Sequence, residues 1–454
     1  MKLNDTLKKW LLLAGYLICA ILLALIHEPW MDELHAWVMA RDLSVVELWS
    51  SMREEGHFCL WYLILMPFAK AGLSVPWLQT IGITLMIVAG WLLVFKTEFS
   101  YLAKVTVLLS FPMIYTFPVI VRCYALIPPI LFLIALVYRK LNEKKYLYAV
   151  LVGLLAHTHI YMEGMVLALF LVYIHDMILP KYRRKSLRMK DFYPPFVIVI
   201  FVLLAFLQVA RNPFEPVYYY LGDTKMIPEV IKGLKPTVSD LFKGYSILPF
   251  GLADTGLKEI LVYTIAFIPM ALLSCVLLFN FSNSGRLIAI MSIGWQVLIS
   301  IFVFSFRVQR VYLPFIIILT IIIMEEKCAE KSINGMVVCL CVLASISGYS
   351  YHLVKDISMS YASFKPLAEA IEKYVPKSEP VFSIEFGGDS VTAYFSDRDK
   401  LFIPMPLDSI KLDSFYVISD RPEFNGFEAD YIYDGSDSFK NHFSLVKLRR
   451  LNNE

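Results

Sequence analysis

Charged residues are scarce in this chain. Asp, Glu, Lys and Arg make up 18% of its 454 residues, whereas hydrophobic residues make up 58%. Soluble globular proteins carry about 25% charged residues, so the shortage of charge excludes an ordinary soluble fold for most of the chain. Mostly apolar runs, near the roughly 20 residues that cross a bilayer, recur from Trp10 to about Ser350. The composition predicts an α-helical polytopic membrane protein.

Cysteines are few and poorly placed for disulfide bonds. There are seven, an odd number, and most lie in apolar segments, while residues 211–258 and the region after 350 have none. We therefore expect no disulfide framework of the kind that stabilises small secreted domains. The cysteines are Cys19, Cys59, Cys123, Cys275, Cys328, Cys339 and Cys341.

The chain also lacks a long basic region. Its two basic clusters are short, YRKLNEKK at 138–145 and KYRRKSLRMK at 181–190. Short cytoplasmic loops of membrane proteins collect Lys and Arg, so topology explains both clusters and we expect no nucleic-acid partner. Lys2, Lys8 and Lys9 place the N-terminus on the same inner side. We interpret the apolar run that follows as a retained first span, because it is long and has no obvious small-x-small cleavage site.

The apolar runs predict about 11–13 transmembrane helices. One conflict remains, because five candidate spans separate the inner N-terminus from the inner loop 138–145, where an even number is required. Segment 58–74 is short and contains Pro67 and Lys70, so it is the candidate for a partial or re-entrant segment. The candidate spans are 10–27, 58–74, 77–95, 104–120, 123–138, 146–161, 163–179, 193–210, 259–280, 286–304, 310–325 and 333–350.

The region 351–454 has a different character and predicts a small soluble α/β domain on the outer side, following a transmembrane domain at 1–350. FKPLAEAIEKYV has the pattern of an amphipathic helix. Five short apolar runs predict strands: PVFSIEF, KLFIP, SFYVISD, ADYIYD and FSLVKLRR. GGDS at 387–390 lacks the rest of a dinucleotide-binding fingerprint, so these glycines are expected to form a turn.

The outer loop 28–57 gathers acids, histidines and an arginine directly after the first span. In the simpler interpretation Asp32 caps a helix that begins near Glu33. The loop then forms interfacial amphipathic helices, with Trp37 and Trp49 at the headgroup level. In the alternative interpretation the acid is catalytic, because a carboxylate held ionised by a nearby cation can accept a proton from a hydroxyl group.

The loop resembles a known family at the residue level. MDELHAWVMARDLSVVELW and EEGHFCLWYLILMPFAKAGLS resemble the first outer loop of the GT-C glycosyltransferase superfamily, in the bacterial branch akin to protein O-mannosyltransferases and lipid A aminoarabinose transferases. In that branch an Asp-Glu pair follows the first span, and a Gly-His-Pro-Pro-Leu-Tyr-Tyr-like motif opens the second. This chain has Phe58 and Cys59 in place of the two prolines. The resemblance extends to the layout of spans up to about residue 350.

The resemblance implies an inverting glycosyltransferase. Its donor would be a polyprenyl-phosphate sugar and its acceptor a protein, lipid or polysaccharide, on the outer face of a membrane that the branch suggests is the bacterial plasma membrane. Asp32 matches the family's catalytic acid residue, which acts as general base on the acceptor hydroxyl, and Glu33 matches its supporting neighbour. The leaving phosphate carries negative charge and needs fixed cations.

Several outer-side residues are candidates for the donor phosphate or sugar. Arg122 and Tyr124 lie in VIVRCYAL, where an unpaired arginine is costly in hydrocarbon. Arg122 is expected either to contact the donor or to pair with Asp32, Glu33 or Glu163. Arg307 and Arg310 are three residues apart and share a helical face, which suits a phosphate fork. Snorkelling to the lipid headgroups is the alternative for this pair.

Histidines add to the candidate site. His57 matches the family motif and is expected near the head group, or as a cap on the span that it precedes. His159 and Glu163 are four residues apart in HTHIYMEG and are therefore expected on one helical face. They are expected to bind sugar hydroxyls or to cap neighbouring spans, because two ligands without a third are weak evidence for a metal site. We assign no metal ligand, although a divalent cation remains an open option.

Two other functional classes stay open from the sequence. A transporter of a lipid-linked or small substrate would have a similar number of spans, but such proteins usually show repeated halves and charged residues at mid-membrane. We find no internal repeat. A non-catalytic scaffold that recruits partners through its C-terminal domain is the third class. The loop 211–258 is too long for a simple connection and is expected to form interfacial helices over the lipid donor or acceptor groove.

Overall fold

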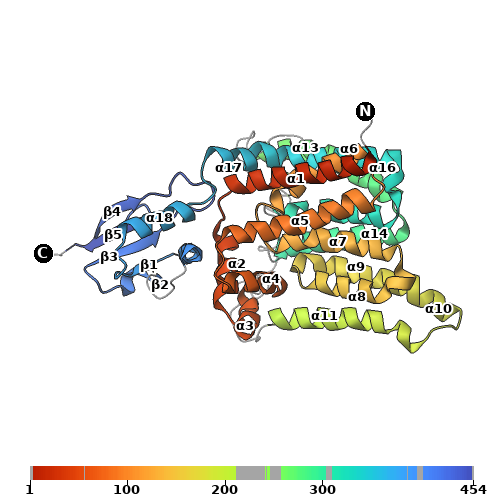
Figure 1. Ribbon diagram of the computed structural model, residues 1–454, viewed down its shortest axis with the longest axis horizontal. Coiled ribbons are helices and arrows are strands. Elements are labelled where there is room, and N and C mark those ends of the chain that lie inside the picture. Colours follow the sequence, from red (N-terminus) through yellow and green to blue (C-terminus); the bar gives the residue numbers. More distant parts are fainter. Residues whose placement is uncertain are drawn as a thin grey trace.

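The computed structural model consists of a helical bundle and a small sheet domain beyond one of its ends (Figure 1). It describes residues 4–55, 57–210, 241, 243–245, 257–302, 309–385, 387–395 and 402–451. Most of the loop 211–258 therefore lies outside the described residues, as does Arg307.

The bundle is formed by α-helices interrupted by short 3₁₀ and π turns. Its first part comprises α1 (Asp5–Ile26), α2 (Met31–Asp42), α3 (Val45–Glu55), α4 (Leu60–Lys70), α5 (Pro76–Lys96), α6 (Tyr101–Leu108), η1 (Pro112–Thr116), η2 (Cys123–Leu126), α7 (Ile127–Tyr138) and α8 (Leu141–Ala156). The second part comprises η3 (Ile160–Met162), α9 (Glu163–Tyr173), η4 (Ile174–Ile178), α10 (Leu179–Arg183), η5 (Met189–Asp191), α11 (Tyr193–Val209), α13 (Leu257–Asn280), α14 (Asn283–Phe302), η7 (Arg310–Tyr312), α15 (Leu313–Met324), η8 (Lys327–Ala329), α16 (Lys331–Ser347), η9 (Gly348–Leu353) and α17 (Val354–Ser358).

Five helices in the described residues are long and apolar enough to cross a membrane: Asp5–Ile26, Pro76–Lys96, Ile160–Arg183, Asn283–Ile301 and Lys331–Ser358. Five more are apolar but shorter: Leu60–Lys70, Cys123–Tyr138, Tyr193–Val209, Ile265–Asn280 and Arg310–Met324. The total of 11–13 transmembrane helices stays a prediction.

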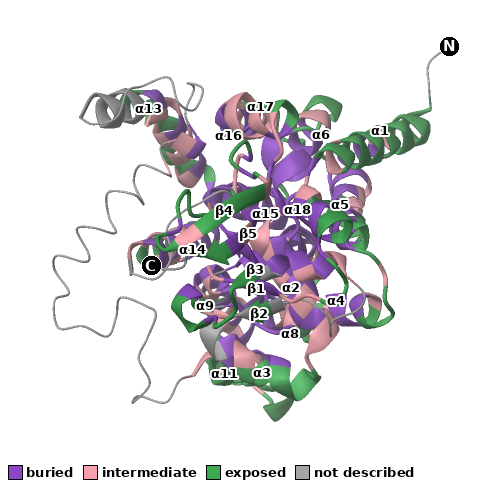
Figure 2. Ribbon diagram, turned by 90° about the vertical axis from the view of Figure 1, so that its left-hand side faces the viewer, coloured by how far each residue is buried: buried purple, intermediate pink, exposed green. Residues whose placement is uncertain are grey.

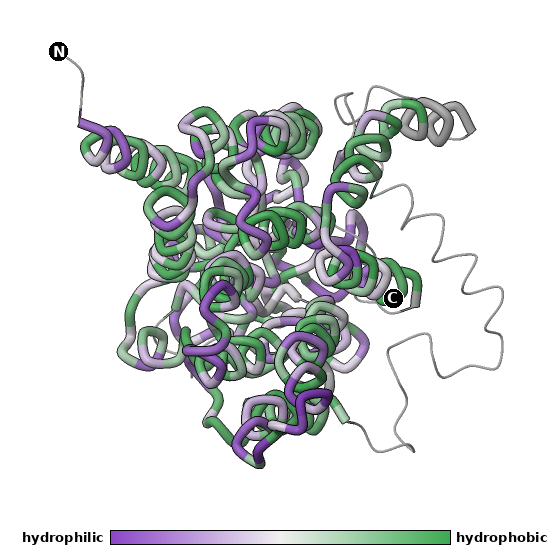
Figure 3. The backbone as a smooth tube through the Cα atoms, turned by 90° about the vertical axis from the view of Figure 1, so that its right-hand side faces the viewer, coloured by the Kyte–Doolittle hydropathy of each residue, from purple (hydrophilic) through white to green (hydrophobic). Residues whose placement is uncertain are grey.

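The flanks of the bundle are apolar on the outside. Large apolar side chains that are exposed on α1 and α11 include Trp10, Leu22, Leu25, Phe196 and Phe206. Figure 2 shows exposed residues along α1, and Figure 3 shows that hydrophobic residues occupy much of the length of the helices. Soluble monomers rarely expose apolar patches of this extent, so this surface suits contact with lipid.

The short helix α4 lies within segment 58–74, the predicted partial or re-entrant segment, which stays a prediction. The backbone N–H of Cys59, just before α4, donates to Gln208 near the end of α11 (2.8 Å), and Lys70 at its other end donates to the carbonyl of Arg41 (3.3 Å). Helix α5 begins at the same end, because Gln79 donates to the carbonyl of His27 (3.3 Å). The chain thus enters and leaves α4 on one side of the bundle. Without segment 58–74, the four spans 10–27, 77–95, 104–120 and 123–138 precede the loop 138–145, and the count is even.

The predicted span 104–120 is interrupted. Helix α6 ends at Leu108, and Pro112, which has no backbone N–H to donate, starts the π turn η1. The interrupted segment nevertheless runs from one end of the bundle to the other. Ser100, just before α6, bonds Asn334 at the start of α16 (2.7 Å), whereas Tyr115 in η1 bonds Asp356 in α17, next to the sheet domain. Broken backbone at this depth is tolerated where protein surrounds it, and residues 111–121 are all buried.

The C-terminal region contains every predicted element. Helix α18 (Phe364–Tyr374) packs on a five-stranded sheet of order β2-β1-β3-β5-β4. The strands are β1 (Val381–Ser383), β2 (Phe402–Pro404), β3 (Ser414–Ser419), β4 (Phe427–Tyr433) and β5 (Ser444–Arg450). Strand β1 pairs in parallel with β2 and β3, while β5 pairs antiparallel with β3 and β4. The GGDS motif forms a turn at Gly387 (φ +89°) that leads into η10 (Gly388–Tyr394).

This region is fixed to the end of the bundle that carries α2. One guanidinium nitrogen of Arg41, in α2, donates to the carbonyls of Thr392 and Phe395, each at 2.9 Å. The carboxylate of Glu28 accepts the N–H of Lys365 in the first turn of α18 (2.7 Å), a favourable place for a negative charge. These hydrogen bonds give the sheet domain a defined position on the segment that follows α1.

We expect Gly387→Ala to weaken the packing of the sheet domain on α2. Gly387 and Gly426 both have positive φ, so alanine costs about 1–2 kcal/mol of backbone strain at either site. Only at Gly387 does an added Cβ also meet a neighbour, the Sδ of Met31 at 1.9 Å. Limited proteolysis should release the C-terminal region faster in Gly387→Ala than in the matched control Gly426→Ala. Equal rates would contradict this packing.

Candidate functional site

A cavity of about 610 Å³ lies between the C-terminal sheet domain and the end of the bundle that carries α2. The bundle supplies two acids, two arginines and two histidines to its wall. The lining residues are Met31, Asp32, His35, Ala36, Glu55, His57, Trp61, Tyr62, Arg122, Cys123 and Arg310 from the bundle, and Ser383, Ile384, Glu385, Gly387, Ser390, Met405 and Pro406 from the sheet domain. A volume of this size holds a ligand as large as a drug molecule.

Asp32 and Arg122 form an ion pair in this cavity. Asp32 lies in the first turn of α2, and Arg122 precedes η2 with extended backbone. Their side chains approach to 2.8 Å between the Asp32 carboxylate and an Arg122 guanidinium nitrogen. The Asp32 side chain keeps 28% of its surface exposed, against 12% for Arg122. The carboxylate is thus held beside a cation and remains accessible from the cavity.

His57 is a neutral acceptor that orients Arg122. Its Nδ1 lies 2.8 Å from the carbonyl of Glu55 and therefore carries the proton, while its Nε2 accepts from Arg122 (3.0 Å). Burial, together with the charges of Arg122 and Arg310, lowers the pKa of His57 to about 4. His57 therefore adds no charge of its own beside the two guanidinium groups near neutral pH.

A second carboxylate lies on the same wall. Glu55 contacts Nε2 of His35 (2.8 Å) and accepts from the hydroxyl of Tyr62 (3.3 Å). Burial acts to raise the pKa of Glu55, but the hydrogen bond and charge of His35 outweigh it and lower the pKa. Sequence reasoning missed His35, Glu55 and Tyr62 as a group, although all three lie within or next to the quoted motif.

Arg310 reaches the cavity from the other side of the bundle. Its Nε donates to the hydroxyl oxygen of Tyr124 (2.7 Å), which also lies 3.0 Å from Nε2 of His159. His159 Nδ1 accepts the backbone N–H of Tyr161 (3.1 Å), so its proton is on Nε2 and points to Tyr124. Tyr124 and His159 thus position Arg310 and do not themselves line the cavity.

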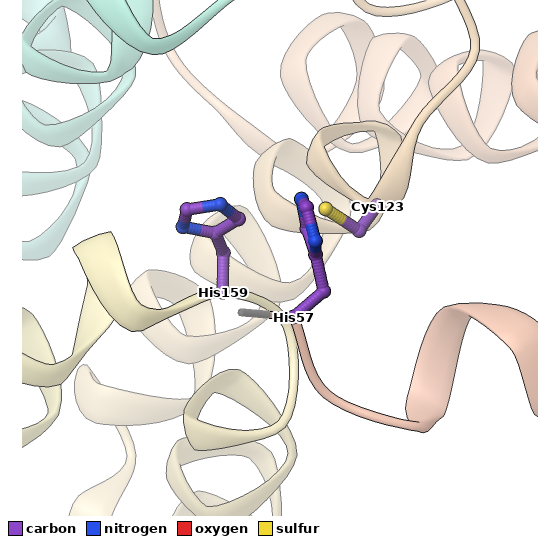
Figure 4. Close-up of side chains that lie close together, drawn as sticks. All are labelled: His57, Cys123 and His159. Carbon is purple, nitrogen blue, oxygen red and sulfur yellow. The ribbon is translucent and has the colours of Figure 1, made fainter. Parts of the chain in front are cut away.

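One cluster of potential metal ligands lies at the cavity wall. It consists of His57, Cys123 and His159, whose potential ligand atoms lie within 4.8 Å of one another (Figure 4). The imidazole lone pairs already accept hydrogen bonds from Arg122 and from the Tyr161 backbone. Both guanidinium groups bias the site against a cation. This cluster is better suited to holding the arginines than to holding a metal ion.

Glu33 faces away from the cavity into a buried charge network. Its side chain is fully buried and accepts hydrogen bonds from the N–H groups of Val121 (2.7 Å) and Trp30 (3.2 Å). His27 bridges it to Asp356 in α17, with distances of 3.0 Å to Glu33 and 3.1 Å to Asp356. Burial opposes a charged imidazole, but the two carboxylates outweigh it and raise the pKa of His27 to about 10.

The remaining candidates are placed as follows. Glu163 begins α9 outside the cavity, and one of its carboxylate oxygens is buried without a hydrogen-bond partner in the described part of the chain. It does not share a helical face with His159, because His159 has extended backbone and precedes η3. Arg307 lies outside the described residues. The cavity therefore unites Asp32, His57, Arg122 and Arg310, and leaves Glu33 and Glu163 apart from them.

Glu33→Gln is expected to lower stability by about 3–5 kcal/mol, because it removes one partner of a buried ion pair. Unfolding of the purified protein in detergent measures this loss. Glu428→Gln is the matched control, since Glu428 is 66% exposed and lies 3.8 Å from Arg449; its effect should be near zero. A Glu33→Gln protein as stable as this control would contradict the structural role.

Stability should also depend on pH through His27. The folded-state pKa of His27 is near 10, above the usual value of 6.5. The stabilisation that its protonated imidazole contributes is therefore complete below about pH 6.5 and is lost as pH rises through 10. Unfolding temperature measured from pH 6 to 10 should fall accordingly. Asp356→Asn removes one of the two carboxylates that raise the pKa of His27. The unfolding temperature of this variant should therefore begin to fall at a lower pH than that of the wild type. Coincident profiles of the two proteins would contradict the network.

Comparisons with protein-family models, with curated proteins and with solved structures find no match to this chain. What the cavity does must therefore follow from its own side chains. They include the partly exposed carboxylate of Asp32 and two positioned guanidinium groups, at the end of a bundle with apolar flanks.

Proposed function

We propose that the protein is an inverting membrane glycosyltransferase that moves a sugar from a polyprenyl-phosphate donor to an acceptor hydroxyl on the outer membrane face. One observation carries this proposal. The partly exposed carboxylate of Asp32, held 2.8 Å from Arg122, shares a cavity with Arg310. A base and two phosphate-binding cations in one cavity are what this transfer requires.

Asp32 acts as the general base. The acceptor oxygen attacks the anomeric carbon of the donor sugar and forms the new glycosidic bond. Its proton passes to the Asp32 carboxylate, and the bond from the anomeric carbon to the phosphate oxygen breaks, so the electron pair leaves with the phosphate. A single displacement of this kind inverts the anomeric configuration.

Arg122 and Arg310 hold the leaving phosphate. Guanidinium groups bind phosphate oxygens through paired, charge-assisted hydrogen bonds. His57 fixes Arg122 and Tyr124 fixes Arg310, so the cations are oriented before the donor arrives. A phosphate that competes for Arg122 weakens its pairing with Asp32 and makes that carboxylate a stronger base.

The surroundings of the cavity suit a lipid-linked donor. Apolar helices with exposed apolar side chains surround the bundle, and the cavity lies at their end, where the head group of a polyprenyl phosphate meets water. A transporter site is expected near mid-membrane, so this placement favours transfer at the surface. The basic loops at the opposite end favour the outer face of a plasma membrane for the cavity.

Asp32→Asn should abolish transfer while keeping the fold. Asparagine has the size of aspartate but cannot take the proton, so a loss of about 10²–10⁴-fold in rate is expected. Mass spectrometry of cell-surface glycans, in a host that lacks the endogenous protein, should show one species disappear at equal protein level.

The matched control is Asp430→Asn, an exposed position on β4, which should leave the glycans unchanged. If deletion of the protein alters the glycans but Asp32→Asn does not, the assignment of Asp32 as base is refuted.

A further inference from the structure

The sheet domain provides one wall of the cavity. Strand β1 contributes its last residue, Ser383, the chain after it contributes Glu385 and Ser390, and the segment after β2 contributes Met405 and Pro406. This wall faces the bundle residues Asp32 and Arg122 across a shared space. The wall, which we call the roof, consists of these five residues.

The roof has a fixed position relative to α2, the helix that carries Asp32. Arg41 bonds the carbonyls of Thr392 and Phe395, at the end of η10. Gly387 packs so closely on Met31 that a Cβ would overlap its sulfur. Because Met31 is the immediate neighbour of Asp32, the roof and the base keep one geometry.

Ser390 is a buried polar group without a partner. Its side chain is 3% exposed, and its hydroxyl makes no hydrogen bond within the described residues. An unsatisfied buried polar group costs about 1–3 kcal/mol, so its presence in a cavity wall calls for a ligand that supplies the bond. Ser444, elsewhere in the same sheet, has its hydroxyl bonded to Asp434 and to the N–H of Gly435 (3.2 and 3.1 Å).

We propose that the roof binds the acceptor and that the acceptor is a saccharide, with Ser390 hydrogen-bonded to one of its hydroxyl groups; this inference rests on the proposed glycosyl transfer. The two arginines take the phosphate of the donor on the bundle side. The sheet domain then presents the acceptor hydroxyl to Asp32 from the opposite side.

The chemistry of the roof favours a sugar ring over an acyl chain. A sugar presents hydroxyl groups at its rim and an apolar C–H face, and the roof combines Ser390 and Glu385 with the apolar surfaces of Met405 and Pro406. Arg421 lies 2.5 Å from Glu385 and balances its charge, so the carboxylate can accept from neutral hydroxyl groups. An acyl chain would leave Ser390 unpaired.

The test uses the full-length protein in lipid nanodiscs with a polyprenyl-phosphate-linked hexose as donor. Maltose, cellobiose, lactose and chitobiose are the acceptor probes. At least one should accept sugar. Ser390→Ala should then raise the concentration of that disaccharide for half-maximal rate by roughly five- to tenfold, the worth of one hydrogen bond. The maximal rate and the half-saturating donor concentration should stay unchanged.

A stability measurement separates this role from a structural one. Ser390→Ala removes an unsatisfied hydroxyl and should unfold at the same or a higher temperature than the wild type. Ser444→Ala removes a bonded hydroxyl and should unfold earlier, with unchanged acceptor dependence.

The outcomes separate the two proposals. If the wild type transfers sugar to a disaccharide and Ser390→Ala does so with the same concentration dependence, the role of Ser390 is overturned while transfer stands. If short serine-containing peptides or phospholipids accept sugar and no disaccharide does, the saccharide class is overturned. If the wild type releases no polyprenyl phosphate by an Asp32-dependent route with any acceptor, the proposed function itself fails.

Discussion

The structure around the cavity depends on one buried network, which consists of Glu33, His27 and Asp356. Two carboxylates and a protonated imidazole share a site that water does not reach, so each charge is stable only while the others stay in place. Asp356 lies near the end of Lys331–Ser358, the last membrane-length helix in the described residues, and the sheet domain follows with α18. Glu33 lies in α2, next to Asp32. This network therefore joins α2, which lies on the bundle side of the cavity, to the segment that leads into the sheet domain.

The network also explains why adjacent acids have different tasks. Successive residues of a helix point about 100° apart, so Asp32 and Glu33 cannot face the same surroundings. Glu33 turns inward and bonds Val121, whose neighbour Arg122 turns toward Asp32. The carboxylate that holds the backbone of residue 121 thus also places the guanidinium beside the base. In the proposed reaction Glu33 is a positioning residue, and Asp32 alone takes the proton.

Much of this arrangement follows from the sequence, and the remainder depends on long-range contacts. The sequence predicts all four cavity residues as candidates. Arg122 interrupts an apolar region and Arg310 shares a predicted helical face with Arg307, whereas Asp32 and His57 are candidates through the resemblance of their loop to a known family. The amphipathic helix and the five strands were predicted from their own periodicity. Asp356 was not, since its partner His27 is 329 residues away and no local pattern marks the pair. The position of Ser390 was likewise hidden, because a serine in a short 3₁₀ helix has no sequence signature that places it at a cavity wall.

The configuration of the new linkage tests the central claim most directly. Purified protein in nanodiscs would transfer sugar from a polyprenyl-phosphate donor of known anomeric configuration, and NMR coupling constants of the product would report the configuration of the new bond. A single displacement with Asp32 as base predicts the opposite configuration to that of the donor. A product with the donor's own configuration would require a second displacement and would contradict the account.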